Sequence, residues 1–194
     1  MRLICIGDSL TFGYGVHLSQ RWTRLCAQET GWELVNEGIN GDTTGGMLAR
    51  MQGGVLAELR EGGLGADRPY VLLMGGSNDV FYSGSDAAAR GNMGAMIHQL
   101  FSVGVLPMVG IPLPADAPHA PRAWAVAVDF EAAERTMKEY CAWLKRYCTA
   151  FGVPYIDFCA DFLSPDGSIR SELLLDGLHP TPEGHQIMAR RLCA

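Results

Sequence analysis

Three residues have the types that catalysis by a serine nucleophile requires. Ser9 comes shortly after an apolar run at residues 3–6, while Asp176 and His179 lie three residues apart near the other end of the chain. A serine hydroxyl needs a neighbouring base to take its proton during attack on a carbonyl. An imidazole serves as that base when a carboxylate holds its ring in one tautomer, and one turn of chain can bring Asp176 and His179 together. These residues, in the chain order Ser, Asp, His, predict a serine hydrolase.

Each of these residues alone also has a structural explanation. A serine after a strand is commonly a turn former or a helix cap, and an aspartate shortly before a proline, as Asp176 is before Pro180, is commonly a turn residue. His17 is the rival base to His179 because it is close to Ser9 in sequence. It has no carboxylate at a comparable spacing, so His179 is the better candidate.

Four short blocks of sequence extend the pattern. They are, in chain order, Gly7-Asp8-Ser9-Leu10, Asn40-Gly41-Asp42-Thr43, Gly76-Ser77-Asn78-Asp79 and Asp176-Gly177-Leu178-His179. In type and order they resemble the blocks of the SGNH hydrolases of the GDSL lipase/esterase family. One such block is weak evidence, whereas four in order, spread over nearly the whole chain, are specific.

The resemblance implies a role for each matching residue. Ser9 would be the nucleophile of a catalytic triad, with His179 as general base and Asp176 as the residue that orients it. The oxyanion hole would consist of the backbone N–H groups of Ser9 and Gly41 and the side-chain amide of Asn78. Fixed donors of this kind stabilise the negative charge that develops on the carbonyl oxygen.

The activity that the resemblance implies is that of an esterase or lipase, which hydrolyses carboxylic esters through an acyl-enzyme and needs neither a metal nor another cofactor. A thioesterase, a lysophospholipase or a carbohydrate acetylesterase would use the same residues. A reading of a different class is a flavodoxin-like binding module whose serine no longer reacts. The intact set of five residues argues against such a module.

Apolar runs alternate with amphipathic segments along the chain, and these segments predict the strands and helices that position the candidate residues. Strands are expected at residues 3–6, 32–35, 70–74, 106–111 and 155–158, and helices at 21–30, 44–60, 86–103, 130–151 and 181–193. This alternation predicts βαβ units and an α/β fold with a parallel sheet covered on both faces. The four blocks follow strands, so they should meet at one edge of the sheet. The resemblance adds a three-layer α/β/α sandwich whose five strands have the flavodoxin-like order 2-1-3-4-5.

Apolar side chains near the blocks predict where the acyl group of a substrate would bind. Phe81 and Tyr82 follow Asn78 closely, and Trp124 lies in a proline-rich segment, residues 112–128, that is expected to be a loop beside the site. The bulk of these side chains favours an ester with a modest acyl chain. Trp124 could equally anchor the loop.

Composition excludes several classes of partner. The chain of 194 residues is 48% hydrophobic, which suits one domain spanning residues 1–194. Its formal net charge of -6 has the wrong sign for a nucleic-acid-binding protein, so a small-molecule ester is the expected partner. The chain enters its first strand at once and has no apolar run long enough for a membrane span, which favours a cytoplasmic protein.

Cysteine and histidine spacing favours neither disulfides nor a metal site. The six cysteines lie in apolar contexts without a Cys-x-x-Cys pair and are expected to be buried free thiols. No cysteine or histidine cluster has the spacing of a zinc site.

Overall fold

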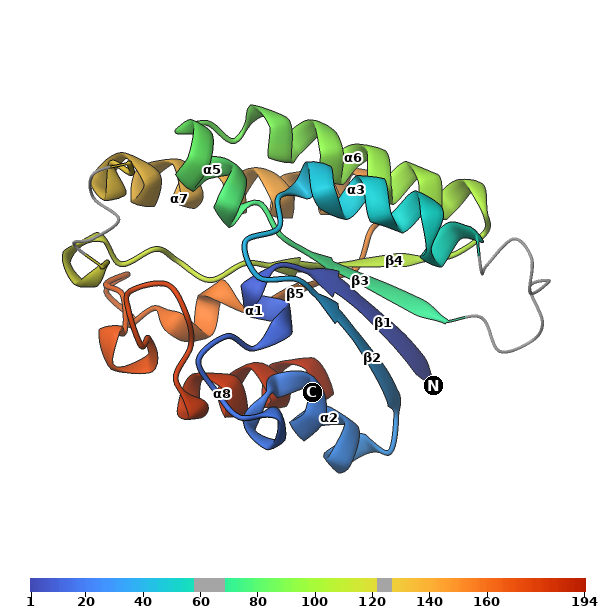
Figure 1. The fold of residues 1–194 in the computed structure, drawn as a ribbon, viewed down its shortest axis with the longest axis horizontal. Helices are drawn as coiled ribbons and strands as arrows, with labels where there is room; N and C mark the ends of the chain where they lie inside the picture. The colour runs from blue at the N-terminus through green and yellow to red at the C-terminus, as the bar shows by residue number, and fades with distance from the viewer. Residues whose placement is uncertain (58–68, 122–126) are drawn as a thin grey trace.

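The computed structural model describes residues 1–57, 69–121 and 127–194. Within them, a five-stranded sheet has the order β2-β1-β3-β4-β5, and all neighbouring strands are parallel (Figure 1). The strands are β1 (Arg2–Gly7), β2 (Glu33–Gly38), β3 (Tyr70–Met74), β4 (Pro107–Ile111) and β5 (Tyr155–Asp157). The predicted parallel sheet and its order 2-1-3-4-5 are therefore confirmed.

Helices cover both faces of this sheet and complete a three-layer α/β/α sandwich (Figure 1). One face carries α2 (Trp22–Thr30) and α8 (Pro182–Cys193). The opposite face carries α3 (Thr44–Gly53), α6 (Ala87–Ser102) and α7 (Phe130–Phe151), with the short α5 (Ser77–Ser83) at one end of it. Another short helix, α1 (Ser9–Phe12), directly follows β1.

The central strands divide their side chains between two hydrophobic cores. In β1, Ile4 and Ile6 belong to the core under α3, α6 and α7, whereas Leu3 and Cys5 belong to the core under α2 and α8. Successive side chains of a strand point to opposite faces, so a strand buried on both sides needs apolar residues at every position. This is why β1 and β3 are visible in the sequence as uninterrupted apolar runs.

The sheet order explains where a site can form. The chain leaves β1 toward β2 on one side, whereas β3 lies on the other side of β1. At such a switch point the connections diverge and leave a crevice beyond the carboxyl ends of the strands. Ser9 follows β1 and Asn78 follows β3, so both lie at this crevice.

The structure differs from the sequence-based expectation in two short helices and in the ends of two elements, whereas the ends of the other expected elements agree to within one residue. Residues 9–12 and 77–83 form α1 and α5, where loops were expected, because elements of 4 and 7 residues are too short to show helical periodicity. The helix expected at 44–60 ends as α3 at Gly53, and its expected end lies outside the described residues. Strand β2 continues to Gly38, because the polar Asn36 is satisfied there by hydrogen bonds to the Gly38 N–H and the Thr11 carbonyl.

All six cysteines fall in the described residues and none forms a disulfide; five are buried and Cys193 is half-buried. No helix in the described parts of the chain is both long and apolar enough to cross a membrane.

Candidate active site

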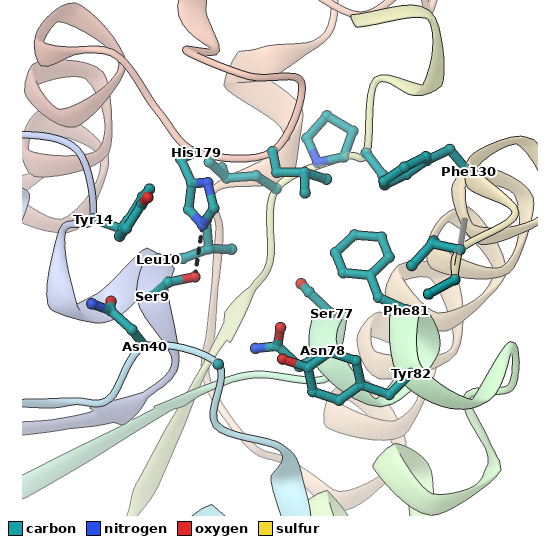
Figure 2. Close-up of a pocket in the computed structure, with 17 residues that line it drawn as sticks. Ser9, Leu10, Tyr14, Asn40, Ser77, Asn78, Phe81, Tyr82, Phe130 and His179 are labelled. Carbon is teal, nitrogen blue, oxygen red and sulfur yellow. Dashed lines mark hydrogen bonds between the residues drawn. The ribbon is translucent and has the colours of Figure 1, made fainter. Parts of the chain in front are cut away.

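The structure brings the hydroxyl of Ser9 and the imidazole of His179 together, although 170 residues separate them. Ser9 is the first residue of α1, and its Oγ lies 2.9 Å from His179 Nε2 (Figure 2). The other ring nitrogen, Nδ1, lies 2.8 Å from Asp176 Oδ2. A hydroxyl, an imidazole and a carboxylate therefore form one continuous chain of hydrogen-bonding groups.

The second oxygen of Asp176 holds the turn that carries His179. Its Oδ1 accepts hydrogen bonds from the backbone N–H groups of His179 (2.9 Å) and Leu178 (3.1 Å). Partial burial by itself raises the pKa of Asp176, but the hydrogen bonds from the His179 ring and from these N–H groups outweigh it, and the net pKa is lowered. The carboxylate therefore stays ionised at neutral pH and can accept a hydrogen bond from the N–H that His179 carries on Nδ1.

A second segment of chain, around residues 116–120, packs against this turn at Gly177. The Asp116 N–H donates to the Gly177 carbonyl at 2.8 Å. Gly177 has a φ of +77°, and a Cβ at this position would lie 2.6 Å from the Asp116 carbonyl oxygen and 2.9 Å from the Ala120 nitrogen. Only glycine fits both the backbone conformation and the space. The position of the His179 ring thus depends on a contact with a loop about 60 residues away in sequence.

Gly41 and Asn78, the other two residues expected in the oxyanion hole, are found beside Ser9 and His179. Both line the cavity that also contains Ser9 and His179, and Figure 2 shows the Asn78 side chain reaching toward Ser9 from α5. One N–H of the Asn78 amide donates to the Asp42 carbonyl at 2.9 Å. A primary amide has two such hydrogens, so the other can serve a ligand in the cavity.

Polar residues of the blocks hold these donors in place. Asp79 accepts hydrogen bonds from the Thr44 N–H (2.9 Å) and hydroxyl (2.6 Å), which ties α5 to the start of α3. Asp8 accepts a hydrogen bond from the Leu10 N–H at 2.9 Å.

Sequence reasoning missed Arg50, whose guanidinium donates to the Asp42 carboxylate (2.8 Å) and to the Gly7 carbonyl (2.9 Å). Its contacts are with residues distant in sequence, so only the fold reveals its role.

The cavity beside Ser9 has a volume of about 630 Å³ and is mainly apolar. Phe81 lines it, and its ring lies 6.1 Å from that of Phe130, centroid to centroid. Tyr82 also lines it, but its side chain is largely exposed at the mouth. Trp124, which was predicted to contribute, lies outside the described residues. The segment 112–128, which was expected beside the site, does contribute lining residues, namely Leu113, Pro114, Ala115 and Val128. Sequence reasoning missed Phe130 and Leu178.

The remaining histidines have other surroundings. His17 is exposed and lines a separate surface pocket with Arg24. His119 pairs with Asp116 at 2.9 Å, and its side chain is 62% exposed. Within the described residues, no group of three or more histidine, cysteine, aspartate or glutamate side chains is arranged to hold a metal ion.

Two buried titratable groups close to the site should make the free energy of unfolding depend on pH, with opposite signs. Burial raises the pKa of Asp8 from 3.8 to about 7, and burial together with the neighbouring Arg21 lowers the pKa of His185 from 6.5 to about 4. Below pH 6.5 the unfolded chain binds a proton on His185 that the folded chain lacks, so stability falls as the pH decreases toward 4. Above pH 3.8 the folded chain keeps a proton on Asp8 that the unfolded chain loses, so stability falls as the pH rises toward 7.

Replacing Asp8 with asparagine should remove the loss of stability that accompanies a rise in pH toward 7, and should leave the effect of His185 in place. The free energy of unfolding of Asp8→Asn, relative to that of the wild type, is expected to increase between pH 4 and pH 7 by roughly 4 kcal/mol at most. Urea unfolding of both proteins at several pH values measures this difference. His185→Asn is the matched variant, and its difference from the wild type should have the opposite slope. Parallel curves for Asp8→Asn and the wild type would contradict the prediction.

Comparison with known proteins gives consistent matches. The model of the GDSL-like Lipase/Acylhydrolase family matches residues 5–187. Esterase TesA from Pseudomonas aeruginosa is 29% identical over 185 residues, which cover 92% of this chain and 79% of that protein.

Solved structures match the fold over almost the whole chain. A putative lipolytic protein of the G-D-S-L family from Desulfitobacterium hafniense has a TM-score of 0.79 at 23% identity, covering 99% of this chain and 97% of that one. The M. smegmatis aryl esterase has a TM-score of 0.78 at 21% identity, covering 99% and 96%. Est24, a carbohydrate acetylesterase from Sinorhizobium meliloti, has a TM-score of 0.78 at 20% identity, covering 100% and 97%.

Proposed function

The chain belongs to the GDSL-like lipase/acylhydrolase family and is a hydrolase acting on esters, and from this we propose that it is a serine esterase that forms an acyl-enzyme on Ser9. The observation that carries the proposal is the chain of contacts from Asp176 through His179 to Ser9, which ends at an apolar cavity. A structural serine has no need of an Asp–His pair aimed at its hydroxyl.

The reaction proceeds in two halves. Ser9 Oγ attacks the ester carbonyl carbon while His179 Nε2 takes the hydroxyl proton, and the carbonyl oxygen becomes an oxyanion. The intermediate then collapses: the bond to the alcohol breaks, and His179 returns the proton to the leaving alkoxide. In the second half, water attacks the acyl-enzyme, His179 takes the water proton, and the acid leaves as Ser9 regains its hydrogen. Asp176 stabilises the imidazolium in both halves.

The oxyanion is bound by the backbone N–H groups of Ser9 and Gly41 and by the Asn78 amide. Asn78→Ala is expected to lower kcat by about 10²–10³-fold, because one fixed donor to the developing charge is lost. Steady-state kinetics with a p-nitrophenyl ester measures this. Gln28→Ala is the matched control: Gln28 carries the same amide group but is exposed on α2 and lines only a separate surface pocket, so this variant should keep full turnover. Unchanged turnover in Asn78→Ala would remove that residue from the oxyanion hole.

A fluorophosphonate probe tests the enzyme against the non-catalytic module. Such a probe phosphonylates a serine only when a base activates it, so folded wild-type protein should be labelled at Ser9 and Ser9→Ala should not be. Peptide mapping identifies the labelled residue. Folded wild-type protein that resists the probe would support the binding module.

The cavity supports a carboxylic ester with a modest apolar acyl chain as substrate. Its wall is mainly aromatic and aliphatic, and the Phe81–Phe130 pair lies in that wall. A series of p-nitrophenyl esters of increasing chain length, run beside acyl-CoA and acetylated sugars with Ser9→Ala as the blank, tests this. The highest kcat/KM should fall on a short or medium acyl ester. A preference for acyl-CoA or for an acetylated sugar would instead assign the thioesterase or the carbohydrate acetylesterase.

A further inference from the structure

Tyr14 is tied to the residue that carries the nucleophile. It lies just beyond α1, and its backbone N–H donates to the Ser9 carbonyl at 3.1 Å. The next residue, Gly15, approaches the turn of Asp176: a Cβ on Gly15 would lie 2.6 Å from Leu175 Cδ1. The segment that carries Tyr14 is therefore hydrogen-bonded to Ser9 and lies close to the chain just before Asp176.

The side chain of Tyr14 lies against the imidazole. The centroids of the Tyr14 and His179 rings are 4.5 Å apart, with 46° between the ring planes. The His179 side chain is only 10% exposed, whereas Tyr14 is 45% exposed, so Tyr14 separates the imidazole from solvent. Figure 2 shows Tyr14 on one side of the His179 ring and the aromatic wall with Phe81 on the other side of the cavity.

We propose that Tyr14 is a positioning residue for the general base: its ring keeps the imidazole of His179 facing Ser9 and stabilises the positive charge that the imidazole acquires. The inference rests on the proposed function of the Ser9–His179 pair. The Asp176 hydrogen bond constrains His179 at one nitrogen, and a ring packed 4.5 Å away restricts how the imidazole can swing about that contact. An aromatic face attracts a cation, and this attraction exists in the transition state but not while the imidazole is neutral.

The proposal predicts which part of Tyr14 matters. Tyr14→Phe keeps the aromatic ring and should retain kcat within about twofold, whereas Tyr14→Leu keeps much of the bulk and loses the aromatic face. Tyr14→Leu should lower kcat and kcat/KM equally, by roughly tenfold, with little change in KM. An equal loss in both constants is typical of an interaction made only in the transition state.

The experiment compares three variants on two esters of the same acid, one with a p-nitrophenyl and one with a small alkyl leaving group. Tyr70→Leu is the matched control, because Tyr70 is 42% exposed but lies at the amino end of β3, whereas Ser9 follows the carboxyl end of the parallel neighbour β1. It should behave as the wild type. The rate of fluorophosphonate labelling, which also needs His179 to remove the Ser9 proton, should fall in Tyr14→Leu by about the same factor as kcat.

Three results would overturn the proposal. The first is a wild-type kcat in Tyr14→Leu, and the second is a higher KM with an unchanged kcat. The third is a loss of kcat on the p-nitrophenyl ester alone, which would make Tyr14 a contact for the leaving group. The proposed function is judged separately by wild-type hydrolysis and by the absence of turnover in Ser9→Ala. Tyr14 can therefore fail as a positioning residue while the esterase assignment stands.

Discussion

Replacing His179 with alanine is expected to lower kcat by roughly 10⁶-fold, the largest effect of any change considered. The imidazole is the group that takes the Ser9 Oγ proton during attack and returns it to the leaving alcohol, and alanine can do neither. Ser9→Ala should cost about the same, because nucleophile and base act as one unit. The double variant should therefore be no slower than either single variant, instead of showing the product of two losses.

Active-site titration and steady-state kinetics on the single and double variants measure these rates. His17→Ala is the matched control, since His17 is the exposed histidine close to Ser9 in sequence, and its loss should leave turnover unchanged. The assignment of His179 as the base of Ser9 would be wrong if kcat of His17→Ala fell as far as kcat of His179→Ala. It would also be wrong if kcat of the double variant fell by the product of the two single losses.

Replacing Asp176 with asparagine is expected to lower kcat by about 10⁴-fold while leaving the fold intact. The asparagine carbonyl can still accept the hydrogen bonds from the backbone N–H groups of Leu178 and His179, so the turn survives. Its amide, however, is a donor to His179 Nδ1, which places the ring proton on Nε2. In that tautomer Nε2 cannot accept the Ser9 proton.

The measurement is kcat together with thermal unfolding, so that a loss of activity is separated from a loss of structure. Asp166→Asn is the matched control, because the exposed Asp166 carboxylate also accepts a hydrogen bond from the backbone N–H two residues later, that of Ser168, at 3.0 Å. This variant should keep kcat close to the wild-type value. If Asp176→Asn retained more than about a tenth of the wild-type kcat, Asp176 would not set the tautomer of His179.

The layout of the fold was predictable because burial leaves a direct mark on strands and long helices. Strand β3 and helix α7 have the bounds expected from the sequence, since one is apolar at most positions and the other has a clear apolar stripe. The short helices α1 and α5 were not predictable, because a single turn or two has too few residues to show a period. Strand β2 was cut short in prediction because its last residues are polar, as a half-covered edge strand allows.

Residue types and their places after strands could be read from the chain alone: Ser9 follows β1, Asn78 follows β3, and an Asp–His pair lies near the end. Parallel strands place such residues at one edge, so their meeting follows from local pattern and sheet rules.

Contacts between elements far apart in the chain became known only from the three-dimensional structure. Sequence patterns treat each segment separately, so they do not show which segments meet. The contacts found only in the fold are those of the Tyr14 ring with His179, of Asp116 with Gly177 and of Phe81 with Phe130. Periodicity reports that a side chain is buried, but not which partner buries it. That choice is made by side-chain packing, which exists only once the sheet order and the loops have brought the surfaces together.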